Sequence, residues 1–108
     1  MKTAIKYQGS KVYAELCGEL DHHSAGAAAA EITETVYAML PRELVLELSR
    51  LSFMDSSGIA LIIRLRRALG EYGGRLYIQN PQRQPYKVME AAGIFKLVDI
   101  RSGGEVTT

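Results

Sequence analysis

Apolar and polar residues alternate along the first part of the chain with the period of a β-strand. Two alternating runs, residues 4–7 and 12–17, are separated by residues 8–11, a short segment that contains a glycine. Side chains in a strand point to opposite faces in turn, and a short glycine-containing link between two such runs is typical of a hairpin. The pattern therefore predicts two antiparallel strands at the start of the chain.

Helical spacing replaces this alternation after residue 24. Over residues 25–39 apolar residues recur three and four positions apart, while Glu31 and Glu34 fall on the other side and Pro41 stops the pattern. We expect an amphipathic helix, preceded by a loop over residues 18–24 and capped by Ser24 or a neighbour. The face that it turns to the core consists of Ala25, Ala28, Ala29, Ile32, Val36, Met39 and Leu40.

The middle of the chain carries its most apolar segments. Residues 44–48, extended by residues 51–54, are typical of a buried strand in a parallel sheet. Residues 57–69 return to helical spacing and predict a mostly covered helix. Its apolar face consists of Ile59, Ile62, Ile63, Leu65 and Leu69, and its narrow outer strip of Ala60, Arg64, Arg67 and Glu71.

The last third repeats the alternation with shorter segments. In chain order we expect a helix end at Gly70 to Gly74, a strand over 75–78, a loop over 80–84, a helix from Pro85 to Gly93, a strand over 95–100 and a loose polar tail over 101–108. Strands that alternate with helices after an initial hairpin predict an α/β fold. We expect a mixed β-sheet with an initial antiparallel hairpin and helices packed mainly on one face.

Composition narrows the class of protein. The 108 residues are 47% hydrophobic, enough for one domain with a modest core. Thirteen basic against twelve acidic residues leave no charge excess that would indicate nucleic acid or an anionic membrane as a partner. Cys17 is the single cysteine, which excludes an internal disulfide, and we expect it to be a small buried side chain. The longest apolar run, residues 59–63, is too short to span a bilayer, so we expect a soluble, cytoplasmic chain.

The segment Asp55-Ser56-Ser57-Gly58 lies between the second apolar strand and its helix. The first N–H groups of a helix lack intrahelical partners, and Asp and Ser side chains are good acceptors for them. One interpretation is therefore a helix cap. The same N–H groups and the helix dipole favour an anion, so the other interpretation is a serine that can carry a phosphate.

Catalytic and metal-binding patterns are not found in the sequence. His22 and His23 are the only histidines, and as sequence neighbours we expect them to point in different directions. No CxxC, HExxH, GxSxG or phosphate-binding glycine motif accompanies them, so we predict neither a catalytic residue nor a metal site. Asp21 and Asp55 both follow strands and would form an acidic patch if their loops share one end of the sheet, although Asp21 could equally be a helix cap.

Four segments carry a family resemblance. Gly-Glu-Leu-Asp-His-His-Ser-Ala from Gly18, Leu-Ser-Phe-Met-Asp-Ser-Ser-Gly from Leu51, the pair Gly73-Gly74 and Gly-Ile-Phe-Lys from Gly93 resemble the STAS-domain anti-sigma-factor antagonists, especially the sporulation-type members. The resemblance covers nearly the whole chain and needs no insertion between these segments. It implies a single STAS domain over residues 1–108.

This resemblance implies a regulator that acts by partner switching. The unphosphorylated form binds an anti-sigma factor that is also a serine kinase, the kinase phosphorylates it with ATP and lets go, and a serine phosphatase resets it. The accepting serine directly follows the aspartate, which here is Ser56. Mg-ATP belongs to the kinase, and no cofactor of the chain itself is implied. The predicted partner-binding residues are Asp21, His22, His23, Asp55, Ser57 and Gly58.

The sequence also departs from the family pattern. Ile59-Ala60 stands where Leu-Gly is common, residues 80–85 differ, and the C-terminal helix of longer members is not expected. Two other functions remain open. A STAS scaffold or transporter accessory module would use the serine only as a cap, and a small hydrolase would need His22 or His23 to reach Ser56.

Overall fold

The computed structural model describes residues 1–101. In chain order its elements are β1 (Lys2–Gln8), β2 (Lys11–Leu20), α1 (Ala25–Met39), β3 (Glu43–Met54), α2 (Ser56–Gly70), β4 (Arg75–Gln79), α3 (Arg83–Ala91), the 3-10 helix η1 (Ile94–Lys96) and β5 (Asp99–Arg101). No helix of this part of the chain is long and apolar enough to cross a membrane. From residue 102 onward, the predicted polar tail lies outside the described residues.

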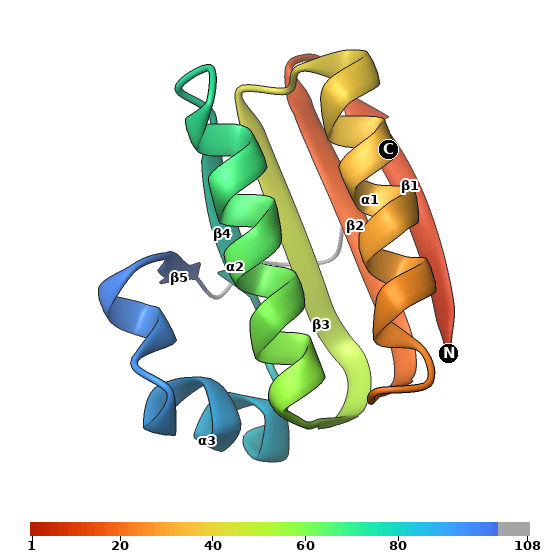
Figure 1. Ribbon diagram of the computed structural model, residues 1–108, viewed down its shortest axis with the longest axis vertical. Helices are drawn as coiled ribbons and strands as arrows, with labels where there is room; N and C mark the ends of the chain where they lie inside the picture. The colour runs from red at the N-terminus through yellow and green to blue at the C-terminus, as the bar shows by residue number, and fades with distance from the viewer. Residues whose placement is uncertain (102–108) are drawn as a thin grey trace.

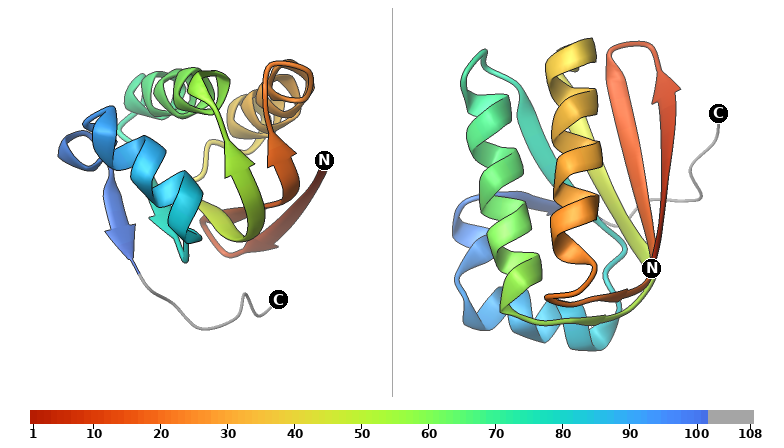
Figure 2. Two further views of the ribbon diagram at one scale, coloured as in Figure 1. Left: turned by 90° about the horizontal axis from the view of Figure 1, so that it is seen from below. Right: turned by 45° about the vertical axis from the view of Figure 1, so that its right-hand side comes forward.

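The strands form one mixed sheet, in which their spatial order is the same as their order in the chain. β1 and β2 are antiparallel, with Ile5 opposite Ala14, whereas β2, β3, β4 and β5 run parallel to one another. α1 and α2 lie side by side on one face of the sheet, and α3 lies across the end at which β3 passes into α2 (Figures 1 and 2). The predicted mixed sheet, with a hairpin first and helices mainly on one face, is confirmed.

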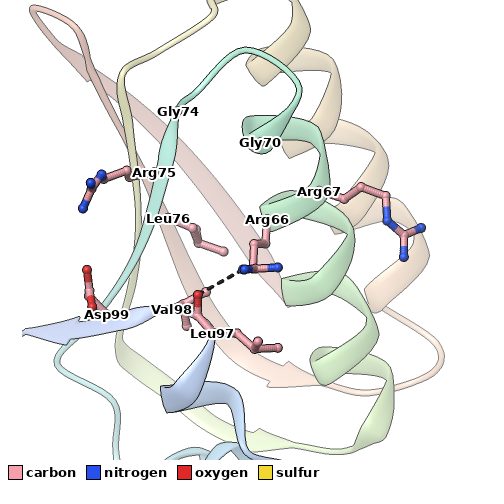
Figure 3. Close-up of a pocket in the computed structure, with 9 residues that line it drawn as sticks. All are labelled: Arg66, Arg67, Gly70, Gly74, Arg75, Leu76, Leu97, Val98 and Asp99. Carbon is pink, nitrogen blue, oxygen red and sulfur yellow. Dashed lines mark hydrogen bonds between the residues drawn. The ribbon is translucent and has the colours of Figure 1, made fainter.

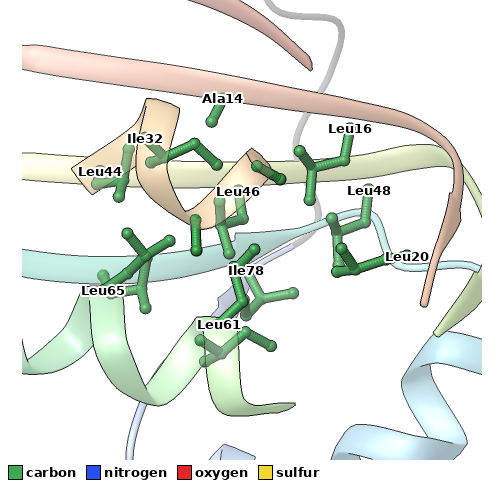
Figure 4. Packing of buried hydrophobic residues seen from close by; sticks show 14 of the residues in the cluster. Ala14, Leu16, Leu20, Ile32, Leu44, Leu46, Leu48, Leu61, Leu65 and Ile78 are labelled. Carbon is green, nitrogen blue, oxygen red and sulfur yellow. The ribbon is translucent and has the colours of Figure 1, made fainter. Parts of the chain in front are cut away.

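The core fills the space between this face of the sheet and the two long helices (Figure 4). Leu16, Leu46 and Ile78 point into it from three strands, and Ile32 and Leu65 meet them from α1 and α2, all at most 1% exposed. Each such side chain contributes about 1.5–3 kcal/mol through its removal from water. This layer holds the strand ends and helix starts in fixed positions.

β2 corrects two predictions. It continues through residues 18–20, which the sequence placed in a loop, because register shifts after Glu15 and Gly18 let the strand follow β3 to its end. Gly18 has a φ of 114°, which side chains with a Cβ rarely adopt. Cys17 was predicted to be buried but is exposed, because alternation turns its neighbour Leu16 into the core and Cys17 to the opposite face of the sheet.

Three side chains predicted for the helical core are exposed instead. Met39 and Leu40 are 53% and 55% exposed, because they lie where α1 ends and the chain turns back to enter β3. Leu40 itself has left-handed backbone angles, and its N–H bonds to the carbonyl of Val36 at 2.8 Å. Ile63 is 38% exposed on the outer side of α2, whereas Ile62, Leu65 and Leu69 are buried.

The C-terminal third differs most from expectation. The strand predicted over residues 95–100 is wrong, because Gly93 (φ 74°) turns the chain into η1 and only Asp99–Arg101 join the sheet. Ile94 is buried, and its carbonyl accepts the N–H groups of Leu97 and Val98. α3 begins at Arg83, two residues before Pro85, which is tolerated because the first-turn N–H groups of a helix have no intrahelical partner.

Candidate functional site

The turn from β3 into α2 presents Ser56 at the surface. Asp55 leaves the strand in an extended conformation and is the N-cap of α2, with its Oδ1 accepting the N–H of Ser57 at 2.8 Å. The capping interpretation is therefore confirmed for Asp55. Ser56 is the first helical residue and is exposed, and within residues 1–101 its hydroxyl makes no hydrogen bond. The hydroxyl of Ser57 makes no hydrogen bond within these residues either, so the two serines of the turn differ in exposure: Ser56 is exposed and Ser57 is half-buried.

Gly58 explains how α2 can start so close to the sheet. A Cβ atom at this position would overlap Cγ of Met54 and lie 3.0 Å from Cδ2 of Leu20, so a larger residue requires the neighbours to move. Gly58 is buried. It therefore shapes the surface of the turn by letting α2 approach Met54 and Leu20 closely, and its predicted part in partner binding stays a prediction.

The loop between β2 and α1 is held by a reciprocal set of hydrogen bonds. Oδ1 of Asp21 accepts the N–H groups of His23 and Ser24, at 2.9 and 3.1 Å, and Oγ of Ser24 accepts the N–H of Asp21 at 3.1 Å. Ser24 is the N-cap residue of α1, but its side chain makes no capping hydrogen bond, and the Asp21 carboxylate holds the turn just before the helix instead. The hydrogen bond from the N–H of His23, followed by those from Ser24, lowers the pKa of the Asp21 carboxyl despite some desolvation.

The two turns meet at one end of the sheet, as their positions after strands predicted. The N–H of Asp55 bonds to the carbonyl of Leu20 at 3.2 Å, and Nδ1 of His22 lies 3.9 Å from Oδ2 of Asp55. The prediction that the two histidines diverge is wrong, because the helical turn before α1 brings the rings of His22 and His23 to a centroid distance of 3.9 Å. An imidazole therefore faces Asp55.

A shallow cavity of about 280 Å³ begins beside this end and runs between α1 and α2. Its walls are small or apolar apart from His22, Ser57 and Arg64. We call it the interhelical groove, and it is lined by His22, Ala25, Gly26, Ala29, Ser57, Ala60, Leu61 and Arg64. The sequence placed Ala60 and Arg64 on an outer strip without a function. The sequence feature that could have indicated this groove is the presence of small residues on both helices, Ala25, Gly26 and Ala29 on α1 and Ala60 on α2.

A second hollow lies on the other side of α2, toward β4 and β5, with a volume of about 370 Å³ (Figure 3). Arg66, Arg67 and Arg75 line it, but their side chains point in different directions, and Nε of Arg66 donates to the carbonyl of Leu97 at 3.0 Å. The arginines thus do not converge on one ligand. Among residues 1–101, no group of three or more His, Cys, Asp or Glu side chains could hold a metal ion.

One residue of the site was missed from the sequence. Gln84 was placed in a loop, but it lies in the first turn of α3, and its amide makes two hydrogen bonds to the backbone of Met54. No local pattern signals this contact, because the two residues are thirty positions apart.

Comparisons with known proteins agree with this geometry. Residues 4–104 match the STAS domain. An anti-sigma F factor antagonist of Lysinibacillus sphaericus is 35% identical over 83 residues, which cover 77% of this chain and 71% of the relative. The unphosphorylated form of the anti-sigma factor antagonist SpoIIAA has a TM-score of 0.85 at 28% identity, covering 96% of this chain and 90% of that one. The phosphorylated form of SpoIIAA from Bacillus has a TM-score of 0.77 at 28% identity, covering 96% and 93%.

The chain belongs to the STAS-domain family of anti-sigma-factor antagonists. Within that family it is of the SpoIIAA type. Anti-sigma-factor antagonists are non-enzymatic regulatory proteins.

Proposed function

We propose that this protein controls a sigma factor by partner switching, with Ser56 as the phosphorylated residue. Its unphosphorylated form binds an anti-sigma factor that is also a serine kinase, which releases the sigma factor. Phosphorylation of Ser56 ends this interaction, and a serine phosphatase restores the binding form. The observation that carries the proposal is the exposed, unengaged hydroxyl of Ser56 at the first position of α2.

The local electrostatics support a switch that needs no refolding. A phosphate adds about −1.5 to −2 charges at neutral pH. The N-terminus of α2 favours this charge, so the phosphorylated turn keeps its structure. If the kinase places acidic groups or the phosphates of its nucleotide opposite Ser56, the new charge faces like charge, and like-charge contacts at an interface can cost several kcal/mol. Phosphorylation can therefore lower the affinity by orders of magnitude.

The docking surface proposed for the kinase surrounds the serine. It combines the turn residues Asp55 and Ser57 with Asp21, His22 and His23 of the neighbouring loop. The interhelical groove continues this surface away from the serine and offers an apolar floor with the cation of Arg64 at its far part. The kinase supplies Mg-ATP, the chain needs no cofactor of its own, and the switch operates in the cytoplasm.

The test is to incubate the protein with its cognate kinase and Mg-ATP and to locate the phosphate by mass spectrometry. Ser56→Ala should abolish the modification. Ser57→Ala is the matched control in the same turn, and it should leave the modification in place. Transfer to Ser57, or none to the wild-type protein, contradicts the proposal.

A binding titration separates a switch from a constitutive scaffold. The Ser56→Asp variant carries a permanent negative charge at the proposed position. It should bind the kinase at least about tenfold more weakly than the unphosphorylated wild-type protein does, which corresponds to roughly 1.4 kcal/mol. Equal affinity of Ser56→Asp and wild type would show that the serine is only part of the helix start.

A further inference from the structure

β3 extends well beyond its neighbour β4. The ladder between them covers only Glu43–Glu47 of β3, whereas β2 accompanies β3 as far as Met54. Within residues 1–101, the second half of β3 therefore has one edge that no strand pairs. Backbone N–H and C=O groups on such an edge need other partners where water is excluded. α3 packs against β3 and supplies side chains at this edge.

Two glutamines at the start of α3, Gln82 and Gln84, occupy the place of a neighbouring strand along this edge. Nε2 of Gln82 donates to the carbonyl of Ser49 at 2.8 Å, in an exposed position. Gln84 makes a two-fold contact in a partly buried position, because Nε2 donates to the carbonyl of Met54 at 3.0 Å and Oε1 accepts the N–H of Met54 at 2.8 Å. A primary amide carries both a donor and an acceptor, so one side chain reproduces the pairing that a neighbouring strand would give.

The peptide unit that joins Met54 to Asp55 is thereby held from both sides. Its carbonyl accepts from Gln84, and its N–H donates to the carbonyl of Leu20 at 3.2 Å. The side chain of Met54 is 1% exposed and lies against Gly58. The plane of this peptide sets the direction in which Asp55 and Ser56 leave the strand. The contact from Gln84 is the one that ties this peptide to α3, thirty residues further along the chain.

We propose that Gln84 is a positioning residue for the phosphorylation of Ser56. The inference rests on the proposed function, because it concerns the transfer of a phosphoryl group to that hydroxyl. Transfer needs the attacking oxygen in line with the phosphorus, and a displacement of about 1 Å can cost up to roughly a hundredfold in rate. Without Gln84 the peptide before Asp55 loses one of its two anchors, and the hydroxyl spends less time in line. The docking surface stays intact, so kcat falls and KM does not change.

The experiment compares Gln84→Met with Gln82→Met. Both variants replace an amide by an apolar side chain of similar length on the same segment, but only Gln84 contacts the backbone next to the serine turn. With the cognate kinase and Mg-ATP, Gln84→Met should lower kcat by about tenfold or more with KM within about twofold. Amide hydrogen exchange, measured by NMR, should become faster at Met54. Gln82→Met should match wild type in kcat and in exchange at Met54.

A second variant covers the case in which Gln84→Met does not fold. Gln84→Glu keeps an acceptor for the N–H of Met54 and loses the donor to its carbonyl, so it should also lower kcat. Wild-type kcat in a folded Gln84 variant whose Met54 amide exchanges faster overturns the positioning role, as does an equal loss of kcat in Gln82→Met. Absence of phosphorylation on wild-type Ser56 instead overturns the proposed function, and with it this role.

Discussion

The two turns at the serine end of the sheet begin alike and end differently. Each follows a strand, starts with an aspartate whose Oδ1 accepts backbone N–H groups, and leads into a long helix. In the first turn the hydroxyl of Ser24 is hydrogen-bonded to the backbone, since it accepts the N–H of Asp21 and donates to the carbonyl of Glu19. In the second turn the hydroxyl of Ser56 has no partner within residues 1–101.

The two serine hydroxyls therefore have different surroundings: that of Ser24 holds the backbone of its turn, and that of Ser56 is exposed. Ser24 stands three residues after its aspartate, which is the position from which a side chain can reach back to the cap. Ser56 directly follows Asp55, and at that position its hydroxyl is directed to solvent while Asp55 alone caps the helix. One residue type therefore supports the fold in one turn and is exposed to solvent in the other.

The largest effect is expected where the second turn is tightest. Gly58→Ala should lower the free energy of unfolding by about 1–3 kcal/mol, because the new methyl group overlaps the buried side chain of Met54. The matched control is Gly26→Ala near the start of α1, where a Cβ meets nothing within 4 Å. That variant should gain up to about 1 kcal/mol from helix propensity. Urea denaturation checks both values, and equal shifts would show that the two helix starts are packed alike.

An intermediate effect is expected from the serines themselves. Ser24→Ala removes the hydroxyl that ties the first turn together and should cost about 1 kcal/mol of unfolding free energy. Ser56→Ala should stay within about 0.5 kcal/mol of wild type, because no hydrogen bond within the described residues is lost. The same denaturation series tests the pair. A cost for Ser56→Ala as large as that for Ser24→Ala would remove the distinction between the two turns.

The smallest effect concerns the pH dependence of the first turn. The pKa of Asp21 is lowered in the folded state, so near its ordinary value of 3.8 the unfolded chain binds more protons than the folded one. The stabilisation is present above that pH and is lost as the pH falls through the folded-state pKa. Asp21→Asn keeps an acceptor without the charge. Its stability deficit relative to wild type at neutral pH should shrink at about pH 3, as measured by urea midpoints.

Much of the fold was predictable because it rests on periodic patterns. The bounds of α1 and the antiparallel pairing of the hairpin follow from helical spacing and from strand alternation. The segment after Gly93 was not predictable, since its course depends on a left-handed glycine and on the burial of Ile94 rather than on a repeat. Leu40 was misplaced because periodicity cannot tell where a helix stops facing the core.

The candidate site likewise contains features that local sequence determines and features that only the tertiary structure determines. Asp55 as a cap and Ser56 beside it could be placed from local sequence, because capping acts between near neighbours. The close approach of the His22 and His23 rings and the contact of Gln84 with Met54 could not be placed, because they depend on loop conformation and on tertiary pairing. The roles of Ser56 and of the residues around it remain predictions until the kinase assay is done.

The order of the strands in the sheet has a consequence for biosynthesis. Because each strand is hydrogen-bonded to its neighbours in the chain, the sheet can grow strand by strand as the polypeptide leaves the ribosome. The elements from β1 to α2 are made first, and the segment with Gln84 follows after β4. If Gln84 positions the serine, a nascent chain is a poor kinase substrate until the segment with Gln84 has been made and has packed against β3. Newly made molecules would then enter the cycle in the unmodified state.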